Sequence, residues 1–222
     1  MSEDRALLEK MPIIQEVVFR HYGWDQEFVT FGYSQKFKDV IKTCGVDHSL
    51  LMRRPTGGGI VWHDLDWTYT LLIPTRDPLF HNPRAFYELS HTLILEALEK
   101  SGAGELHLAP CPRACGIVPK KIEVSQCFIQ PELNDVMVDG DQKVAGAAIK
   151  KSKQGVLLQG SISKKPLQNI DWKIFHTHFI LALSKHFKSK ALPFSYKEID
   201  HFEDEKNLWY QKMSEVEWNT CR

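Results

Sequence analysis

The chain has 222 residues, of which 43% are hydrophobic and 25% are charged, and its formal net charge is zero. This neutral balance argues against broad nucleic-acid binding, and the chain has no apolar run of the roughly 18 residues that a membrane helix needs. The five cysteines lack the spacing of a disulfide framework and the first residues lack an apolar signal core, so we expect one cytoplasmic domain over residues 1–222, with no nucleic-acid or membrane partner.

The first half of the chain mixes short strands with amphipathic helices. Residues 16–31 alternate loosely between apolar and polar side chains, which predicts a strand, a turn and a second strand. Apolar residues at helical spacing predict a short helix over 35–44 that ends near Gly45. A buried strand is predicted over 67–73, and a longer helix has its apolar face between 86 and 98.

The second half begins with an irregular segment, 106–131, that carries three of the five cysteines. Apolar residues then alternate with a period of two, which predicts a three-strand meander with a lysine-rich turn over 150–154 before its last strand. A helix follows over 172–187, and the charged tail carries enough large apolar residues to dock a last helix. Because strands and helices do not alternate regularly, we expect an α+β fold with a mixed β-sheet flanked by helices. The strands of the meander are expected at 135–138, 142–149 and 155–162.

A glycine-rich stretch between Arg53 and Asp64 is the most informative local feature. Three consecutive glycines, 57–59, follow the pair Arg53 and Arg54 and precede His63 and Asp64. Glycines in a row are costly to order, and their use is to let backbone N–H groups approach a ligand closely. The neighbouring arginines suit a phosphate, a carboxylate or another anionic group.

His63 and Asp64 have the residue types of a general base with an orienting carboxylate. Adjacent residues on a strand point to opposite faces, so we do not expect a direct dyad. We expect His63 instead to hold the glycine loop in place. Trp62 and Trp67 are assigned to the core rather than to a ligand tunnel.

Four segments of the chain form one ordered set of motifs. They are Thr30-Phe31-Gly32-Tyr33-Ser34-Gln35, Arg53-Arg54-Pro55-Thr56-Gly57-Gly58-Gly59 with His63-Asp64, Gln142-Lys143-Val144-Ala145-Gly146-Ala147-Ala148 and Leu157-Leu158-Gln159-Gly160-Ser161-Ile162. Together they resemble the lipoate–protein ligase and octanoyltransferase superfamily, and the resemblance covers essentially the whole chain, including its closing segment. It implies a single catalytic domain without a C-terminal accessory domain, with a fold similar to biotin ligases and class II aminoacyl-tRNA synthetases.

The resemblance implies an enzyme that attaches an octanoyl or lipoyl group to one lysine of a lipoyl-carrying domain. Lys143 begins a strand of small side chains and is the expected contact to the acyl carbonyl, and Cys127, in a Cys-Phe pair, is the expected nucleophile. An acyl-Cys127 thioester taken from acyl carrier protein needs no ATP and no other cofactor. The expected acceptors are 2-oxoacid dehydrogenase E2 domains or the glycine cleavage H protein. The expected substrate-binding residues are Arg53, Arg54, Thr56, Gly57, Gly58, Gly59, His63, Gly146, Ala147 and Gly160.

The same resemblance leaves an ATP-dependent lipoate–protein ligase open. Such an enzyme forms an acyl-adenylate, and Asn134 and Asp135 would then help to place magnesium and nucleotide. A third alternative is a non-catalytic module that only retains the acyl pocket. It is supported by the lack of the family's usual histidine beside Gln159, and Ile149 is a second departure that makes the site more apolar.

Two further groups of residues have weaker interpretations. The spacing of Cys111 and Cys115 differs from the commoner zinc pattern, and no fourth ligand is obvious beside Cys127, so no metal site is expected. The lysines at 150, 151 and 153 suit either a solvated hairpin tip or a contact to an acidic partner protein.

Overall fold

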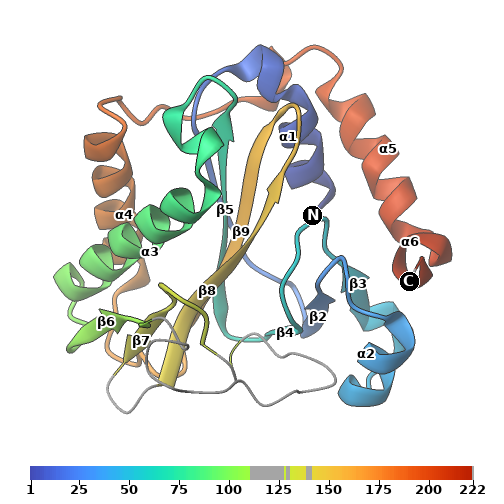
Figure 1. Cartoon of the computed structure of the whole chain (residues 1–222), viewed down its shortest axis with the longest axis horizontal. Helices are drawn as coiled ribbons and strands as arrows, with labels where there is room; N and C mark the ends of the chain where they lie inside the picture. Colours follow the sequence, from blue (N-terminus) through green and yellow to red (C-terminus); the bar gives the residue numbers. More distant parts are fainter. Residues whose placement is uncertain (111–127, 129–130, 139–141, 222) are drawn as a thin grey trace.

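The structure is a computed structural model, and it describes residues 1–110, 128, 131–138 and 142–221 (Figure 1). Within this part of the chain the strands form two sheets. The larger sheet is antiparallel, in the order β1 (Val18–Tyr22), β5 (Asp66–Pro74), β9 (Gly155–Ser163), β8 (Gln142–Lys151), β7 (Val136–Val138) and β6 (Leu106–Leu108).

The smaller sheet contains the only parallel pairing among the described strands. Its central strand β2 (Phe28–Phe31) runs parallel to β3 (Leu51–Arg53) and antiparallel to β4 (Val61–His63). The prediction of mixed β-structure flanked by helices is therefore confirmed, with the parallel component confined to the smaller sheet.

Helices cover both faces of the larger sheet (Figure 1). The main core lies between this sheet and the pair α3 (Pro83–Lys100) and α4 (Trp172–His186). A second core forms where α1 (Ser2–Ile14) and the start of α5 (Phe202–Ser214) pack on the opposite face. A third, smaller core joins α2 (Phe37–Cys44) to the smaller sheet, and α6 (Val216–Thr220) contacts β3.

Local signals fix where these helices begin and end. The Asn82 side chain accepts a hydrogen bond from the backbone N–H of Ala85 and so caps the start of α3. Asp171 caps α4 in the same way. Gly45 ends α2 in the left-handed conformation, with φ +63°, which a glycine adopts without steric cost.

Alternation along the central strands separates the core from the site. On β5, Trp67 and Tyr69 are buried in the main core, whereas Thr68 lies on the opposite face. On β9, Leu158 joins that core, and its neighbour Gln159 faces away from it. Because side chains alternate across a strand, one face of the sheet is apolar and the other offers polar groups toward the smaller sheet.

Most predicted elements are confirmed, and the differences have physical reasons. The two strands predicted in 16–31 exist but pair in different sheets, since β1 joins β5 and β2 joins β3 and β4. The helix α1 has a weak apolar pattern and was not predicted. The segment predicted as irregular begins with the edge strand β6, and β8 extends through Lys151, so the turn is shorter than expected. No helix in the described residues is long and apolar enough to cross a membrane.

Candidate active site

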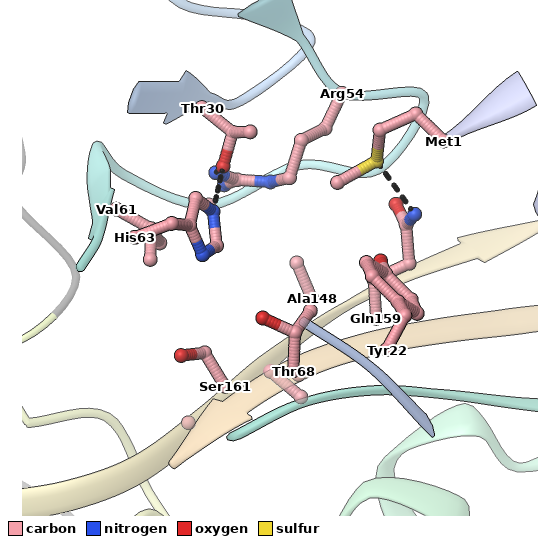
Figure 2. A pocket seen from close by; sticks show the side chains of 14 residues that line it. Met1, Tyr22, Thr30, Arg54, Val61, His63, Thr68, Ala148, Gln159 and Ser161 are labelled. Carbon is pink, nitrogen blue, oxygen red and sulfur yellow. Dashed lines mark hydrogen bonds between the residues drawn. The ribbon is translucent and has the colours of Figure 1, made fainter. Parts of the chain in front are cut away.

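A pocket lies between the two sheets, in the region of the glycine loop (Figure 2). Its volume, with its open mouth included, is about 370 Å³. Figure 2 shows side chains of the smaller sheet and the glycine loop on one side and side chains of the larger sheet on the other. The lining residues are Met1, Tyr22, Thr30, Arg54, Gly58, Val61, His63, Thr68, Gly146, Ala147, Ala148, Gln159, Gly160 and Ser161.

A buried carboxylate, that of Asp66, collects the polar groups at one end of this pocket. Its Oδ2 accepts hydrogen bonds from Ser161 Oγ at 2.6 Å and Thr68 Oγ1 at 2.7 Å, and it lies 2.8 Å from His63 Nδ1. At the other end, Gln159 bonds to Asp4 and Thr56, and Tyr22 also bonds to Asp4. Each polar side chain that lines the pocket is thus tied into a hydrogen bond, which leaves mainly carbon atoms to face a ligand.

His63 extends this network to the glycine loop. Its Nε2 lies 2.7 Å from Thr30 Oγ1, and Thr30 Oγ1 accepts a hydrogen bond from Arg54 Nη1 at 2.8 Å. Arg54 Nη2 donates in turn to the carbonyl oxygens of Gly57 and Gly59 at 2.9 and 2.8 Å. His63 is therefore linked to the glycine loop indirectly, through Thr30 and Arg54.

The partner of His63 is Asp66 rather than its neighbour in sequence. Asp64 instead forms a surface ion pair with Lys165, so no His63–Asp64 dyad exists. Burial lowers the pKa of His63, although its hydrogen bond to Asp66 opposes that shift. Burial by itself would raise the pKa of Asp66, but the hydrogen bond and charge of His63 and the hydroxyl donors lower it. A neutral His63 that donates from Nδ1 and accepts at Nε2 satisfies both partners.

The glycine loop is anchored at several points. Gly58 lines the pocket with φ +85°, a conformation that side chains other than glycine rarely adopt. Thr56 is fully buried and donates to Gln159 Oε1 on β9 at 2.9 Å. Gly57 and Gly59 contribute the carbonyls that Arg54 holds. Of the predicted binding residues in this loop, the structure therefore places Arg54 and Gly58 at the pocket, and the others support them.

Arg53 has a different role from the one that its sequence position predicts. It is fully buried, and its guanidinium donates to the backbone carbonyls of Tyr33, Gln35, Trp218 and Asn219. These contacts fasten the C-terminal segment to the smaller sheet, away from the residues that line the pocket. The prediction that Arg53 binds substrate is corrected to a structural role.

We expect Arg53→Lys to lower the free energy of unfolding by about 2–4 kcal/mol, because one ammonium cannot serve this set of buried carbonyls. Urea denaturation of the variant and of the wild type measures the change. Arg84→Lys, at an exposed position of α3, is the matched control. Equal stability of the two variants would contradict the structural role.

Lys143 reaches the pocket side of the sheet because of an irregularity in β8. Met137 pairs with Lys143 whereas Val136 pairs with Ala145, so β8 contains one extra residue at this point. Such a bulge reverses the alternation of side chains. Lys143 consequently lies beside Gly146, where an added Cβ would be 2.4 Å from Lys143 Cε.

The Lys143 ammonium is buried against Asp135. Its Nζ lies 2.7 Å from Asp135 Oδ2, and the two side chains are 3% and 0% exposed. The hydroxyl of Tyr87, on α3, donates to Asp135 Oδ1 at 2.5 Å and accepts from the backbone N–H of Ala147 at 3.2 Å. The backbone N–H of Glu132 also donates to Asp135 Oδ2.

His91 completes the surroundings of this ion pair. It lies one turn beyond Tyr87 on α3, with the two ring centroids 4.3 Å apart. It is fully buried, and neither ring nitrogen has a hydrogen-bond partner within the described part of the chain. Burial and the nearby charge of Lys143 lower the pKa of His91 to about 3.

This shift makes stability depend on pH. The unfolded chain takes up a proton at this histidine near pH 6.5, whereas the folded chain does so only near pH 3. We therefore expect His91 to reduce the free energy of unfolding by about 1.4 kcal/mol for each unit that the pH falls through this window. Stability measured from pH 7 to pH 4 should fall less steeply in His91→Phe, and His186→Phe, exposed at the end of α4, should keep the wild-type slope. Parallel slopes in all three proteins would contradict the expectation.

The predicted nucleophile, Cys127, lies outside the described residues, as do Cys111 and Cys115. Phe128, which directly follows Cys127, has its ring centroid 5.9 Å from Lys143 Nζ. Asn134 has a left-handed backbone conformation, with φ +67°. Trp67 is in the core as expected, whereas Trp62 is 43% exposed, so its assignment to the core was wrong. Within the described residues, no group of three or more His, Cys, Asp or Glu side chains is arranged to hold a metal ion.

Several residues of the site were not predicted from the sequence. Asp66 and Thr68 on β5 and Ser161 on β9 are polar positions that alternate with buried apolar ones. That alternation was a usable signal, because polar residues on one face of an otherwise buried strand need partners. Tyr87 and His91 are four residues apart on a helix and had no comparable signal.

Comparison with known proteins identifies the family of the chain. Residues 1–189 match the family model of the lipoyl protein ligase A/B catalytic domain. An octanoyltransferase LipM from Macrococcus caseolyticus is 30% identical over 203 residues, which cover 86% of this chain and 72% of the relative. The octanoyltransferase LipM of Staphylococcus aureus is 30% identical over 207 residues, covering 89% of this chain and 69% of the relative.

Solved structures have the same fold. Lipoate–protein ligase A bound with ATP has a TM-score of 0.72 at 19% identity and covers 99% of this chain and 92% of its own. The bipartite lipoate protein ligase of Thermoplasma acidophilum has a TM-score of 0.68, also at 19% identity, and covers 99% of this chain and 89% of its own. With its glycine loop, its buried lysine and the match over most of its length, the chain belongs to the lipoyl protein ligase A/B catalytic-domain family.

Proposed function

We propose that this protein is an acyltransferase of protein lipoylation. It transfers an octanoyl or lipoyl group from a carrier-protein thioester to one lysine of a lipoyl-carrying domain, through a thioester on Cys127. The observation that carries the proposal is the pocket between the sheets, with Lys143 beside its wall at Gly146. The likeness to relatives named octanoyltransferase gives independent support.

The polarity of the pocket suits an acyl chain, because most of its exposed lining is carbon. On the larger sheet, Ala148 presents only a methyl group to the pocket, and the polar groups opposite it are bonded to one another. A saturated chain loses no hydrogen bonds when it enters such a pocket, and its burial is favourable.

In the first step, the thiolate of Cys127 attacks the carbonyl carbon of the donor thioester. A new C–S bond forms, the donor C–S bond breaks, and the carrier sulfur leaves as a thiolate that takes up the proton lost from the Cys127 thiol. The ammonium of Lys143, held at its place by Asp135, is the expected donor to the carbonyl oxygen as negative charge develops there. The position of Phe128 over Lys143 supports this pairing, because Phe128 is the next residue after Cys127.

In the second step, the neutral amine of the acceptor lysine attacks the acyl-enzyme. A C–N bond forms, the bond to Cys127 sulfur breaks, and the proton lost by the amine balances the one that the thiolate gains. Exchange of one thioester for another is nearly thermoneutral, and conversion of a thioester to an amide is downhill. These two reaction steps therefore need neither ATP nor a metal ion.

The ATP-dependent ligase is the second candidate, because ligases share this fold. The ligase requires ATP and the transferase does not, so one assay distinguishes the two functions. Incubate the protein and a lipoyl domain in two mixtures, one with octanoyl carrier protein and no ATP, the other with free octanoate or lipoate, ATP and magnesium, and follow the mass of the lipoyl domain. Octanoylation without ATP supports the transferase. Modification of the lipoyl domain only with free octanoate or lipoate and ATP would replace it with the ligase, and no modification in either mixture would favour a binding module.

A further inference from the structure

We infer that Asp135 is the fixed counterion of Lys143 and that Tyr87 is a positioning residue that holds this carboxylate, so that Asp135 is not available as a magnesium ligand. The inference rests on the proposed role of Lys143 at the acyl carbonyl. It gives Asp135 a different role from the one that the ligase alternative requires.

The hydrogen bonds of Asp135 carry the first part of the inference. Oδ2 faces the Lys143 ammonium at 2.7 Å and the backbone N–H of Glu132, and Oδ1 accepts from the Tyr87 hydroxyl at 2.5 Å. Both oxygens are therefore engaged, and the carboxylate is fully buried. A magnesium ion requires nearly ideal octahedral oxygen ligands, and here it would have to lie beside a buried ammonium of the same charge sign. The residues present do not fit magnesium at this position.

The position of Tyr87 carries the second part. Its hydroxyl bridges two strands of the larger sheet, because it donates to Asp135 just before β7 and accepts from the backbone N–H of Ala147 on β8. The buried His91 ring contacts the Tyr87 ring in an edge-to-face arrangement. Tyr87 thus ties the carboxylate to the same strand that carries Lys143, and this fixes the ammonium relative to the pocket wall at Gly146.

This arrangement specifies what Lys143 does. A lysine held by a buried carboxylate in a fixed direction is suited to hydrogen-bond donation at one point in the site. A hydroxyl that orients the carboxylate affects the reaction through Lys143 and makes no contact with the acyl group itself. Loss of the Tyr87 hydroxyl should therefore lower turnover and leave donor binding nearly intact.

The test compares Tyr87→Phe with Tyr210→Phe, which removes a hydroxyl from a ring that is 65% exposed on α5. In transfer from octanoyl carrier protein to a lipoyl domain, we expect kcat of Tyr87→Phe to fall about 10-fold, with KM for the donor within about twofold of the Tyr210→Phe value. Equal kcat values in the two variants would overturn the positioning role.

A second measurement does not depend on activity. Limited acetylation of the folded protein, read by peptide mass, gives the rate at which each lysine is modified. Lys143 should react severalfold faster in Tyr87→Phe than in the wild type or in Tyr210→Phe, since its counterion is less firmly held. An unchanged rate would overturn the inference even if the wild type proves to be an active transferase. If the wild type has no transfer activity, the proposed function fails, and the acetylation rates alone decide the inference.

Magnesium itself provides the third readout. Magnesium chloride added to the wild-type protein alone should leave its melting temperature unchanged. An increase that is lost in Asp135→Asn would show that the carboxylate does bind the ion and would overturn the assignment.

Discussion

Lys143→Met is expected to abolish acyl transfer and to destabilise the fold. The substitution leaves the carboxylate of Asp135 buried without its cation, although the hydrogen bonds from Tyr87 and Glu132 remain. Breaking a buried ion pair by removing one partner costs about 3–5 kcal/mol. Loss of the donor at the acyl carbonyl should slow transfer by about 100- to 1000-fold. Urea denaturation and a single-turnover transfer assay measure the two effects.

A double-variant cycle separates the ion pair from simple loss of packing. Lys143→Met combined with Asp135→Asn removes both charges. The double variant should therefore lose markedly less free energy of unfolding than the sum of the losses in the two single variants. Lys153→Met, at the exposed turn between β8 and β9, is the control for loss of a surface lysine. Additive effects of the two single variants would mean that Lys143 and Asp135 are not coupled in the folded protein.

Gly32→Ala is expected to have a comparably large effect, because it moves the glycine loop. A Cβ at position 32 would lie 1.9 Å from the carbonyl oxygen of Gly58 and 2.9 Å from the carbonyl carbon of Gly57. Both contacts are to backbone, so no side chain can turn aside to relieve them. The loop is also fixed nearby, since the N–H of Tyr33 donates to the carbonyl of Thr56. We expect a loss of about 3 kcal/mol in the free energy of unfolding and a displaced pocket wall at Gly58.

Transfer should then fall by about 100-fold, as expected when a site shifts by about 1 Å. Gly23→Ala is the matched control, because an added Cβ there meets no atom within 4 Å. The two variants are compared by thermal denaturation and by their transfer rates. If Gly32→Ala were as stable and as active as Gly23→Ala, the close approach of Gly32 to Gly58 would not limit the site.

The sequence predicted the elements that have a strong local signal. The helices at 37–44, 83–100 and 172–186 and the strands β5, β7, β8 and β9 were all anticipated within a few residues. Their apolar periods, caps and glycine or proline boundaries act over short distances along the chain. The family motifs likewise located Arg54, Gly58, Gly146, Ala147 and Gly160, each of which lines the pocket.

Interactions between distant segments were not predictable in the same way. The bulge in β8 depends on pairing with β7. Without the bulge, regular alternation would place Lys143 on the same face as Ala147, toward the main core. The link from Asp66 through His63 and Thr30 to Arg54 joins β5, β4, β2 and the end of β3. Arg53 looks like its neighbour Arg54 in the sequence, yet one holds the C-terminal segment and the other the glycine loop. Only the three-dimensional arrangement separates these two roles.

Transfer through Cys127 is tested most directly by the intact mass of the purified protein after incubation with octanoyl carrier protein in the absence of ATP. We expect a mass increase of one octanoyl group that is present in the wild type, absent in Cys127→Ser and reversed by neutral hydroxylamine, as a thioester requires. A wild-type protein that gains no acyl group under these conditions, or an adduct that persists in Cys127→Ser, would contradict transfer through Cys127.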